Sequence, residues 1–277
     1  MRKLRQCEGT QINSGSSMCR IDWGKILGAI MVEPGVKIPE FTAEALKQLC
    51  HADRPGRIYP ICDFVEYAKS GGEPQVGATG YGPNQFNGLN AQTDSFTLPK
   101  FDEMVNANLL KGASLEWDVY FFDKDRVYGY NDGTEELAGL PMSTVYPTPT
   151  PFSTSGSKSQ LVVNFCHADI EDAYKNIDFV EIDFNANKVL KGLTEVVLIK
   201  DADNKYKLVE KIGGYDVTAK FGEEIAKGAQ TVLIGATSAE YKDGKLTIVA
   251  EDGATPKLAA PSILLEAGIE YIEGVEA

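Results

Sequence analysis

The chain has 277 residues, of which 43% are hydrophobic and 24% charged, a composition typical of globular proteins with one large or two smaller domains. Its 40 acidic and 27 basic residues give a net charge of −13, divided into −8 over residues 1–188 and −5 over residues 189–277. This balance argues against a protein that grips nucleic acid, because such proteins place Lys and Arg against the phosphates.

Membrane spans and secretory signals are not expected. No segment approaches the roughly 18 consecutive apolar residues that a membrane-spanning helix needs. The basic residues Arg2, Lys3 and Arg5 are not followed by an apolar segment, so we interpret the N-terminus as a solvated arm. The sequence therefore predicts synthesis in a cytoplasm and no membrane partner.

The first predicted elements are a strand and a short helix. The apolar run Ile26–Val32 ends at Pro34 and Gly35, which predicts a buried strand closed by a turn. Thr42 can cap a helix that continues to Cys50, because apolar residues recur there at helical spacing.

Residues 70–95 predict a long loop. The segment has six glycines and two prolines, and it offers little apolar surface for a core of its own. Loops of this length are uncommon unless they cover a ligand or reach a neighbouring subunit. We expect the subunit contact, because the segment lacks the acid, base and nucleophile that an active-site lid would cover.

The middle of the chain predicts a helix followed by strands. A helix is expected to open at residues 97–99 and to end near Gly112. Four strands are expected after it, the first two as a β-hairpin: Trp117–Phe122, Arg126–Tyr130, Gln160–His167 and Phe179–Phe184. The Pro/Thr/Ser-rich residues 147–159 predict an exposed connection within this region.

A domain boundary is expected near residue 188. The paired runs Glu195–Lys200 and Lys205–Glu210 predict a hairpin, and Asp216 can cap a helix that ends at Lys227. Asp243 and Gly244 separate two further runs that predict another hairpin. The interpretation is a domain over residues 1–188 and a small β-sandwich over residues 189–277.

The cysteines do not predict a disulfide framework or a metal centre. Their odd number favours free thiols, and they are Cys7, Cys19, Cys50, Cys62 and Cys166. Zinc is the alternative, because Cys50-His51 and Cys166-His167 supply four potential ligands. The spacing does not fit known zinc modules, and adjacent residues on a strand point to opposite faces.

Catalytic motifs are not evident either. Lys205 and Tyr206 occupy positions where a calcium loop beginning at Asp201 would need a ligand and a glycine. No phosphate-binding loop or G-x-S-x-G motif occurs, and a catalytic triad would depend on His51 or His167. Carboxylates such as Asp169, Glu171 and Asp172 are clustered, as chance produces in an acidic chain. No catalytic, cofactor-binding or metal-binding residues are therefore predicted, and the chain is not expected to be an enzyme.

Three stretches together resemble virion structural proteins of tailed phages. Residues 1–35 resemble the openings of such proteins, and residues 115–146, with D-K-D-R-V-Y-G-Y, are similar to their tube-forming or ring-forming β-domain. Residues 193–274, with G-G-Y-D-V-T-A-K-F-G, look like a small Ig-like appendage. The resemblance implies a mainly β (α+β) fold, with a tail-tube-like β-barrel or sandwich, a few short helices and a C-terminal Ig-like β-sandwich.

The resemblance also implies a function and partners. Copies of the chain would form a ring or tube at the tail or head-tail region of a virion, together with other virion proteins, and the loop 70–95 would clasp a neighbour. Strand edges would pair around a channel through which DNA passes without specific binding. The location would be the virion, after synthesis in the host cytoplasm.

Other interpretations remain open at this point. The chain could decorate a capsid, or it could be a surface-attached module that binds glycans. A hydrolase that uses carboxylates is the enzymatic alternative. If copies of the chain self-assemble, we expect residues 1–188 to make the contacts between copies and the last ninety residues to be peripheral.

Overall fold

The computed structural model describes residues 23–78, 80–156, 158–202 and 204–276. Strands make up 42% and helices 18%, which confirms the expectation of a mainly β chain. The chain forms two compact units. Unit 1 comprises the chain up to Leu46 together with Ile58–Leu190, and unit 2 comprises Lys47–Arg57 together with the chain from Lys191 onward. Residues 47–57 thus belong to unit 2, whereas the sequence interpretation assigned them to the first domain.

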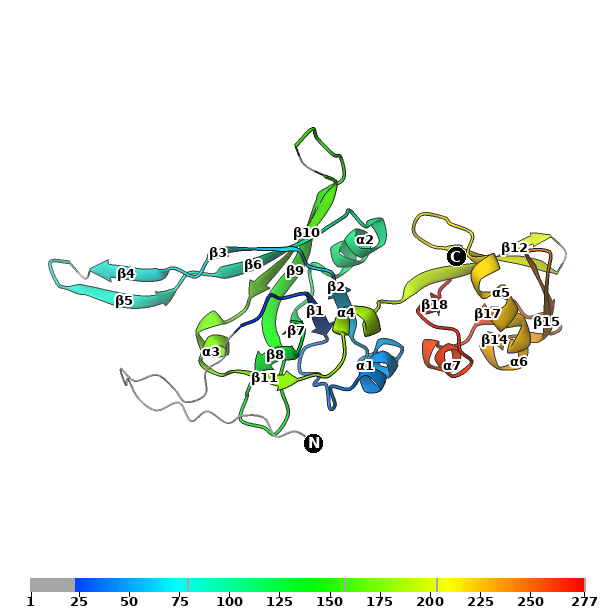
Figure 1. Cartoon of the computed structure of the whole chain (residues 1–277), viewed down its shortest axis with the longest axis horizontal. Coiled ribbons are helices and arrows are strands. Elements are labelled where there is room, and N and C mark those ends of the chain that lie inside the picture. Colours follow the sequence, from blue (N-terminus) through cyan, green and yellow to red (C-terminus); the bar gives the residue numbers. More distant parts are fainter. Residues whose placement is uncertain (1–22, 79, 157, 203, 277) are drawn as a thin grey trace. The chain divides into compact units, whose positions relative to one another are not determined.

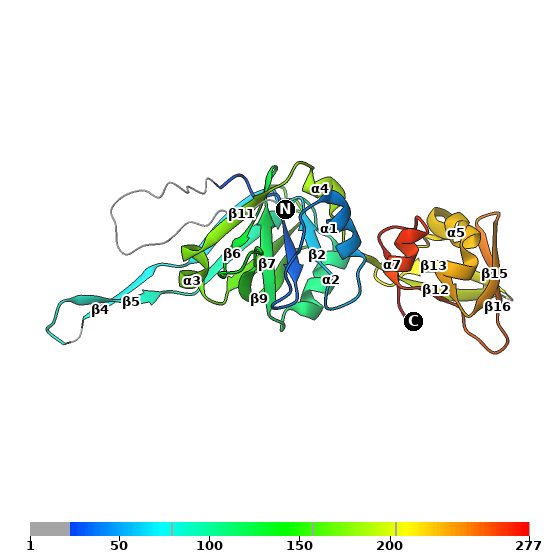
Figure 2. The same ribbon diagram turned by 90° about the horizontal axis from the view of Figure 1, so that it is seen from below.

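Unit 1 is built on a nine-stranded sheet that curls into a half-barrel (Figure 1, Figure 2). The main path runs β11-β8-β7-β9-β10-β6-β3, and β1 joins β7 to β2. The strands are β1 (Gly28–Val32), β2 (Tyr59–Cys62), β3 (Glu66–Gly71), β6 (Gln92–Leu98), β7 (Trp117–Phe122), β8 (Arg126–Tyr130), β9 (Leu140–Thr150), β10 (Gln160–His167) and β11 (Ile177–Glu181). Every pairing in this sheet is antiparallel.

Four helices accompany the sheet of unit 1 along the chain: α1 (Ala43–Cys50), whose last turn belongs to unit 2, α2 (Glu103–Gly112), α3 (Ile170–Lys175) and α4 (Ala186–Val189). The main core cluster lies on one face of the sheet, where alternate side chains of its strands meet. The opposite face of β1 and β7 is also buried, at Ile30, Tyr120 and Phe122. Four phenylalanines form its centre, with ring centroids 4.7–6.2 Å apart: Phe64, Phe96, Phe121 and Phe165. Leu109 of α2 is buried against this cluster.

The predicted elements agree with the structure where the local pattern is strong. The hairpin β7–β8 and the strand β10 have the predicted bounds. The helix α2 starts later than predicted because β6 continues to Leu98, and Asp102 caps the helix by accepting bonds from the N–H groups of Met104 and Val105 at 2.9 Å. The expected connection after residue 147 is also corrected, since β9 continues to Thr150.

The prediction of a long loop over residues 70–95 is wrong. The segment forms a projecting hairpin in which β3 and β6 lead into β4 (Pro74–Ala78) and β5 (Asn84–Leu89), as Figure 1 shows in cyan. Glycine content misled the sequence interpretation, because backbone pairing needs no apolar side chains. Gly71 has a φ of +77°, and a side chain at this position would overlap the Ala91 carbonyl oxygen.

Unit 2 contains a five-stranded sheet in the order β15-β16-β13-β12-β18 and a two-stranded sheet β14-β17. The strands are β12 (Thr194–Ala202), β13 (Lys205–Glu210), β14 (Leu233–Ile234), β15 (Ala236–Lys242), β16 (Lys245–Ala250), β17 (Lys257–Leu258) and β18 (Ile272–Gly274). Its helices are α5 (Thr218–Lys227), α6 (Ala229–Val232) and α7 (Pro261–Glu266). β12 and β18 are parallel.

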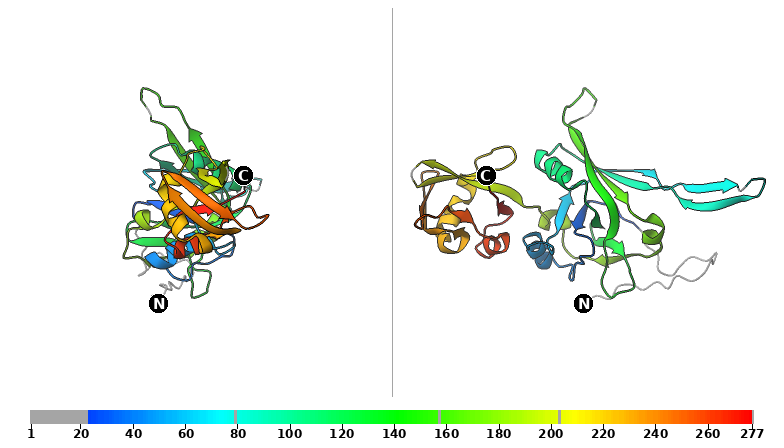
Figure 3. Two further views of the ribbon diagram at one scale, coloured as in Figure 1. Left: turned by 90° about the vertical axis from the view of Figure 1, so that its right-hand side faces the viewer. Right: turned by 180° about the vertical axis from the view of Figure 1, so that it is seen from behind.

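The core of unit 2 lies between the larger sheet and these helices (Figure 3). Ile225 of α5 and Val232 of α6 pack with Leu208 and Leu246 of the sheet. The expected two-sheet sandwich is therefore corrected: helices, with only the small β14-β17 sheet, form the second layer. The amphipathic pattern of α5 supplies that layer, because its apolar side needs a sheet face to cover it.

Two observations complete the description. None of the described helices is long and apolar enough to cross a membrane. The predicted basic arm at Arg2, Lys3 and Arg5, together with Cys7 and Cys19, lies outside the described residues.

Candidate assembly arm

The β4–β5 hairpin is an uncharged projection of unit 1, and we call residues 74–91 the arm. Residues 74–93 contain no Asp, Glu, Lys or Arg, in a chain that is 24% charged. Val76 and Phe86 lie directly opposite each other in the ladder and are 57% and 60% exposed, and Tyr81 near the tip is fully exposed. A two-stranded ribbon with an uncovered apolar pair is marginally stable by itself. The arm therefore has the surface expected of a segment that packs against a partner.

A polar cluster with a buried centre fixes the root of the arm to the sheet. At its centre, Asp94 of β6 lies 2.6 Å from Nε2 of His167, which ends β10. Tyr67 of β3 and Gln92 of β6 donate to Oδ1 of Asp94 at 2.9 and 3.0 Å. Tyr174 of α3 donates to Oδ2 of Asp94 at 3.3 Å and accepts from Gln92 at 3.0 Å. Three strands and a helix thus converge on one carboxylate.

This environment favours the ionised form of Asp94. Burial raises the pKa of Asp94, but the hydrogen bond and charge of His167, with the bonds from Tyr67 and Gln92, outweigh burial and hold the pKa below its ordinary value. Burial and the nearby Asp94 raise the pKa of Tyr67 and of Tyr174, so both phenols keep their protons and act as donors. The cluster is therefore a charge-assisted brace of the kind that gives strong, directional bonds.

One atom of the cluster lacks a partner among the described residues. Nδ1 of His167 is buried and makes no hydrogen bond there, while Nε2 faces Asp94. The neighbouring Cys166 does not join the cluster, since its Sγ lies 3.3 Å from Oγ1 of Thr93. Asp94 and His167 thus form a pair that joins β6 to the end of β10.

A second bond secures the arm from α3. Oε1 of Glu171 accepts the backbone N–H of Leu89, in the last residue of β5, at 2.9 Å. Of the three carboxylates singled out in the sequence, Glu171 therefore has a structural role. Asp169 makes contacts of its own. The side chain of Asp172 lies outside the part of the chain that the structure describes.

The other sequence candidates that lie among the described residues do not form a metal centre. Within the described ranges, no group of three His, Cys, Asp or Glu side chains is placed to hold a metal ion. Cys50 is buried, and His51 is bonded through both ring nitrogens to the backbone within unit 2. Asp201 pairs with Lys207 at 3.0 Å.

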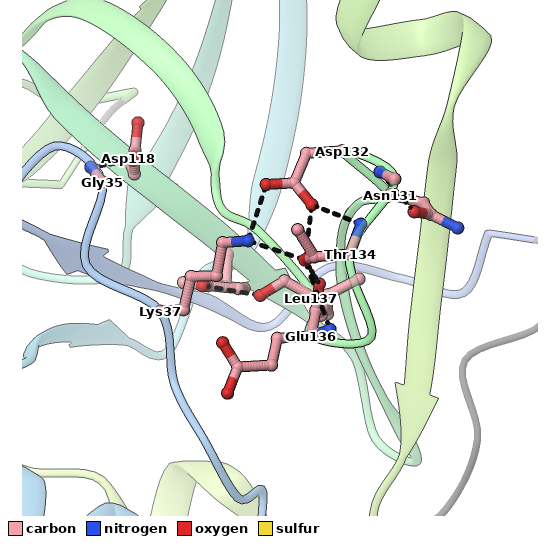
Figure 4. A network of polar contacts seen from close by, with 10 residues as sticks. Gly35, Lys37, Asp118, Asn131, Asp132, Thr134, Glu136 and Leu137 are labelled. Carbon is pink, nitrogen blue, oxygen red and sulfur yellow. Dashed lines mark hydrogen bonds and ion pairs between the residues drawn. The ribbon is translucent and has the colours of Figure 1, made fainter.

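A separate polar network in unit 1 is a loop brace (Figure 4). Nζ of Lys37 lies 2.6 Å from Oδ2 of Asp132 and donates to Oγ1 of Thr134 at 2.7 Å. The bond from Lys37, followed by those from Thr134, lowers the pKa of Asp132 to about 2. Asp118 accepts the N–H of Gly35 at 2.7 Å. These bonds join the loop after β1 to the loop after β8 and to β7, and Lys37 and Asp132 already pair with each other.

Sequence reasoning found the position of the arm but neither its structure nor its root. The alternation of Gln92, Asp94 and Phe96 on one face of β6 is a strand signal that the glycine-rich composition obscured. Tyr174 could not have been assigned, because its contact with Asp94 joins residues eighty positions apart.

Comparison with known proteins identified no relative: no family model, no curated protein and no solved structure matches the chain.

Proposed function

We propose that the chain is a non-enzymatic structural protein of a tailed-phage virion that self-assembles into a ring or tube, with a neighbouring copy packed against the arm. Other virion proteins would bind the assembly, and DNA would pass through its channel without specific contacts. In this proposal unit 1 is the tube-type or ring-type β-domain. Unit 2 is a peripheral domain, in the position that the resemblance to an Ig-like appendage suggests. Its sheet-and-helix layers differ from those of an Ig-like sandwich.

The observation that carries the proposal is the uncharged arm. Copies with a net charge of −13 repel one another, and the repulsion is smallest where no charges meet. The arm exposes Val76, Tyr81 and Phe86 in such a region. Covering them would add apolar burial and would stabilise a ribbon that its own chain leaves uncovered.

The direct test is the state of association of the purified chain. Mass photometry and negative-stain electron microscopy should show rings or tubes, and these should be lost in the double variant Val76→Asp/Phe86→Asp. Two carboxylates on the arm would face the buried surface of the neighbour without partners. A wild-type chain that remains monomeric up to high micromolar concentration, with no stacked particles, would contradict the proposal.

A matched control is available in unit 2. Val249 on β16 is 46% exposed, so Val249→Asp adds one of the two charges of the arm variant to a strand of unit 2. Assembly should be unaffected by this change. Loss of assembly in the Val249 variant would show that added charge, and not the arm, decides the outcome.

A further inference from the structure

The outer edge of β3, at one end of the strand path, and the outer edge of the projecting strand β9 differ in whether their backbone can accept another strand. Gly72 donates its N–H to the Ala91 carbonyl at 3.3 Å, and the register of β3 with β6 is regular from there. In an antiparallel ladder alternate residues bond to the same neighbour. Ala68 and Ser70 therefore face β6, while the backbone N–H and C=O groups of Tyr67 and Lys69 point to the other side of β3.

No strand in the described part of the chain pairs with that other side. The side chains do not cover it, since residues 66–70 are all exposed. β3 is thus an edge strand with unused donors and acceptors, which is the template that an added strand requires.

On β9, prolines protect the edge that faces away from β10 against the addition of another strand. Pro147 and Pro149 pair with Val163 and Leu161 of β10, and Pro151 continues the alternation after the strand ends. Proline has no N–H, so the donors that maintain the ladder with β10 come from the residues between the prolines. The missing donors lie on the side away from β10, and a strand added there would find no N–H at successive outward positions.

We propose that the free edge of β3 is a β-addition site for a second copy of this chain, whose edge strand continues the sheet of unit 1. The inference rests on the proposed function and specifies where its contact is made. Residues 67–93 carry only Lys69 and Glu73, whose charges cancel, so a second copy approaches this edge without net repulsion. The arm continues from β3, and the copy that pairs with β3 also covers the arm.

The test removes one outward donor. Lys69→Pro deletes an N–H that points away from β6, so the bonds between β3 and β6 remain and the chain should fold. The dissociation constant of assembly, measured by mass photometry, should rise at least about tenfold, the equivalent of roughly 1.4 kcal/mol. Ala239→Pro is the matched control, because the register of β15 with β16 directs its N–H outward from an edge of the other sheet. This control should assemble like the wild type.

Hydrogen exchange at single-residue resolution gives a readout that does not depend on a variant. In the dissociated chain the amides of Tyr67 and Lys69 should exchange faster than those of Ala68 and Ser70. On assembly the first two should become protected, which removes the alternation. Full assembly of Lys69→Pro, or assembly of the wild type without protection of Tyr67 and Lys69, would overturn the inference.

The outcomes separate this inference from the proposed function. A wild-type chain that never associates contradicts the proposed function itself. A wild-type chain that forms rings while the edge of β3 keeps exchanging leaves the proposed function intact and shows that only the site is wrong. If Lys69→Pro does not fold, the exchange pattern of the wild type decides the question.

Discussion

The two Cys-His dipeptides of the chain have opposite surroundings. Cys50-His51 ends α1 and packs within unit 2, where Nδ1 of His51 bonds to the Lys47 carbonyl and Nε2 accepts the N–H of Tyr271, both at 2.9 Å. Cys166-His167 ends β10 in unit 1, where His167 faces the carboxylate of Asp94. The dipeptide is the same, but one histidine binds backbone and the other binds a charge.

The difference shows what each histidine does. Because Tyr271 donates to Nε2, the proton of His51 is on Nδ1 and the ring is neutral. Tyr271 has a φ of +62°, which is uncommon for a bulky residue, and the bond to His51 helps to hold that backbone. His51 therefore shapes a turn, whereas His167 binds the buried carboxylate of Asp94 at the root of the arm.

The largest expected effect is on the reactivity of the Cys50 thiol compared with a free thiol. Burial raises the pKa of the Cys50 thiol to about 12, so the thiolate fraction at pH 8 is about 10⁻⁴, against about a quarter for an unperturbed thiol. Alkylation of Cys50 should therefore be at least about 1,000-fold slower than that of a free thiol. Peptide mass mapping after timed labelling measures it, and denatured chain provides the control. Labelling of Cys50 at the free-thiol rate in folded protein would refute the buried site.

The next effect is on the stability of unit 2, which should fall while that of unit 1 is unchanged. His51→Ala removes one hydrogen bond to the Lys47 carbonyl and one from the Tyr271 N–H and opens a small cavity, which should cost unit 2 about 3 kcal/mol. Hydrogen exchange of the β16 amides reports this loss. Fluorescence of Trp23 and Trp117, the only tryptophans, reports unit 1 and should be unchanged. Unaltered exchange in unit 2 would show that His51 is dispensable there.

The brace at the arm should make unit 1 sensitive to acid. The folded pKa of Asp94 is lowered, so its contribution to stability is present above the ordinary value of about 3.9 and is lost as the pH falls through the folded pKa. Asp94→Asn should cost about 2 kcal/mol at pH 7 and should flatten the loss of stability below about pH 4. Denaturant titrations followed by tryptophan fluorescence at pH 3 to 7 test it. Equal acid sensitivity in both proteins would assign the effect to other carboxylates.

The smallest effect is expected at the second bond to the arm. Glu171→Ala removes the acceptor of the Leu89 N–H and should weaken local structure by about 1 kcal/mol, which makes that amide exchange about fivefold faster. The β7–β8 amides serve as the control and should keep their rates. Unchanged exchange at Leu89 would mean that α3 does not hold the arm.

The structure also changes how the peripheral unit can be tested. The domain boundary that the sequence predicts near residue 188 would make removal of the later residues a clean deletion. Arg57 pairs with Glu273 at 2.8 Å and Lys47 with Glu270 at 2.6 Å within unit 2. The deletion would therefore uncover residues 47–57, and single substitutions such as Val249→Asp are the better experiment.

The strong local patterns were predictable from the sequence. The aromatic runs on either side of Asp123 identified β7 and β8, and Asp243-Gly244 identified the hairpin of β15 and β16, because turn chemistry and alternation act between near neighbours. The short strands β2 and β18 were missed, since a few residues carry no period and their pairing partners are remote.

By itself the sequence determined a mainly β, acidic chain with two long uncharged stretches, at residues 74–93 and 137–157. Tertiary structure decided that the first stretch is a projecting hairpin and that His167 lies against Asp94. It also decided which strand edges stay open. The physical reason is that composition and turn residues act locally. Which residues of a strand bond to which neighbouring strand, and which charged groups pair in the interior, depends on segments that meet only when the chain folds.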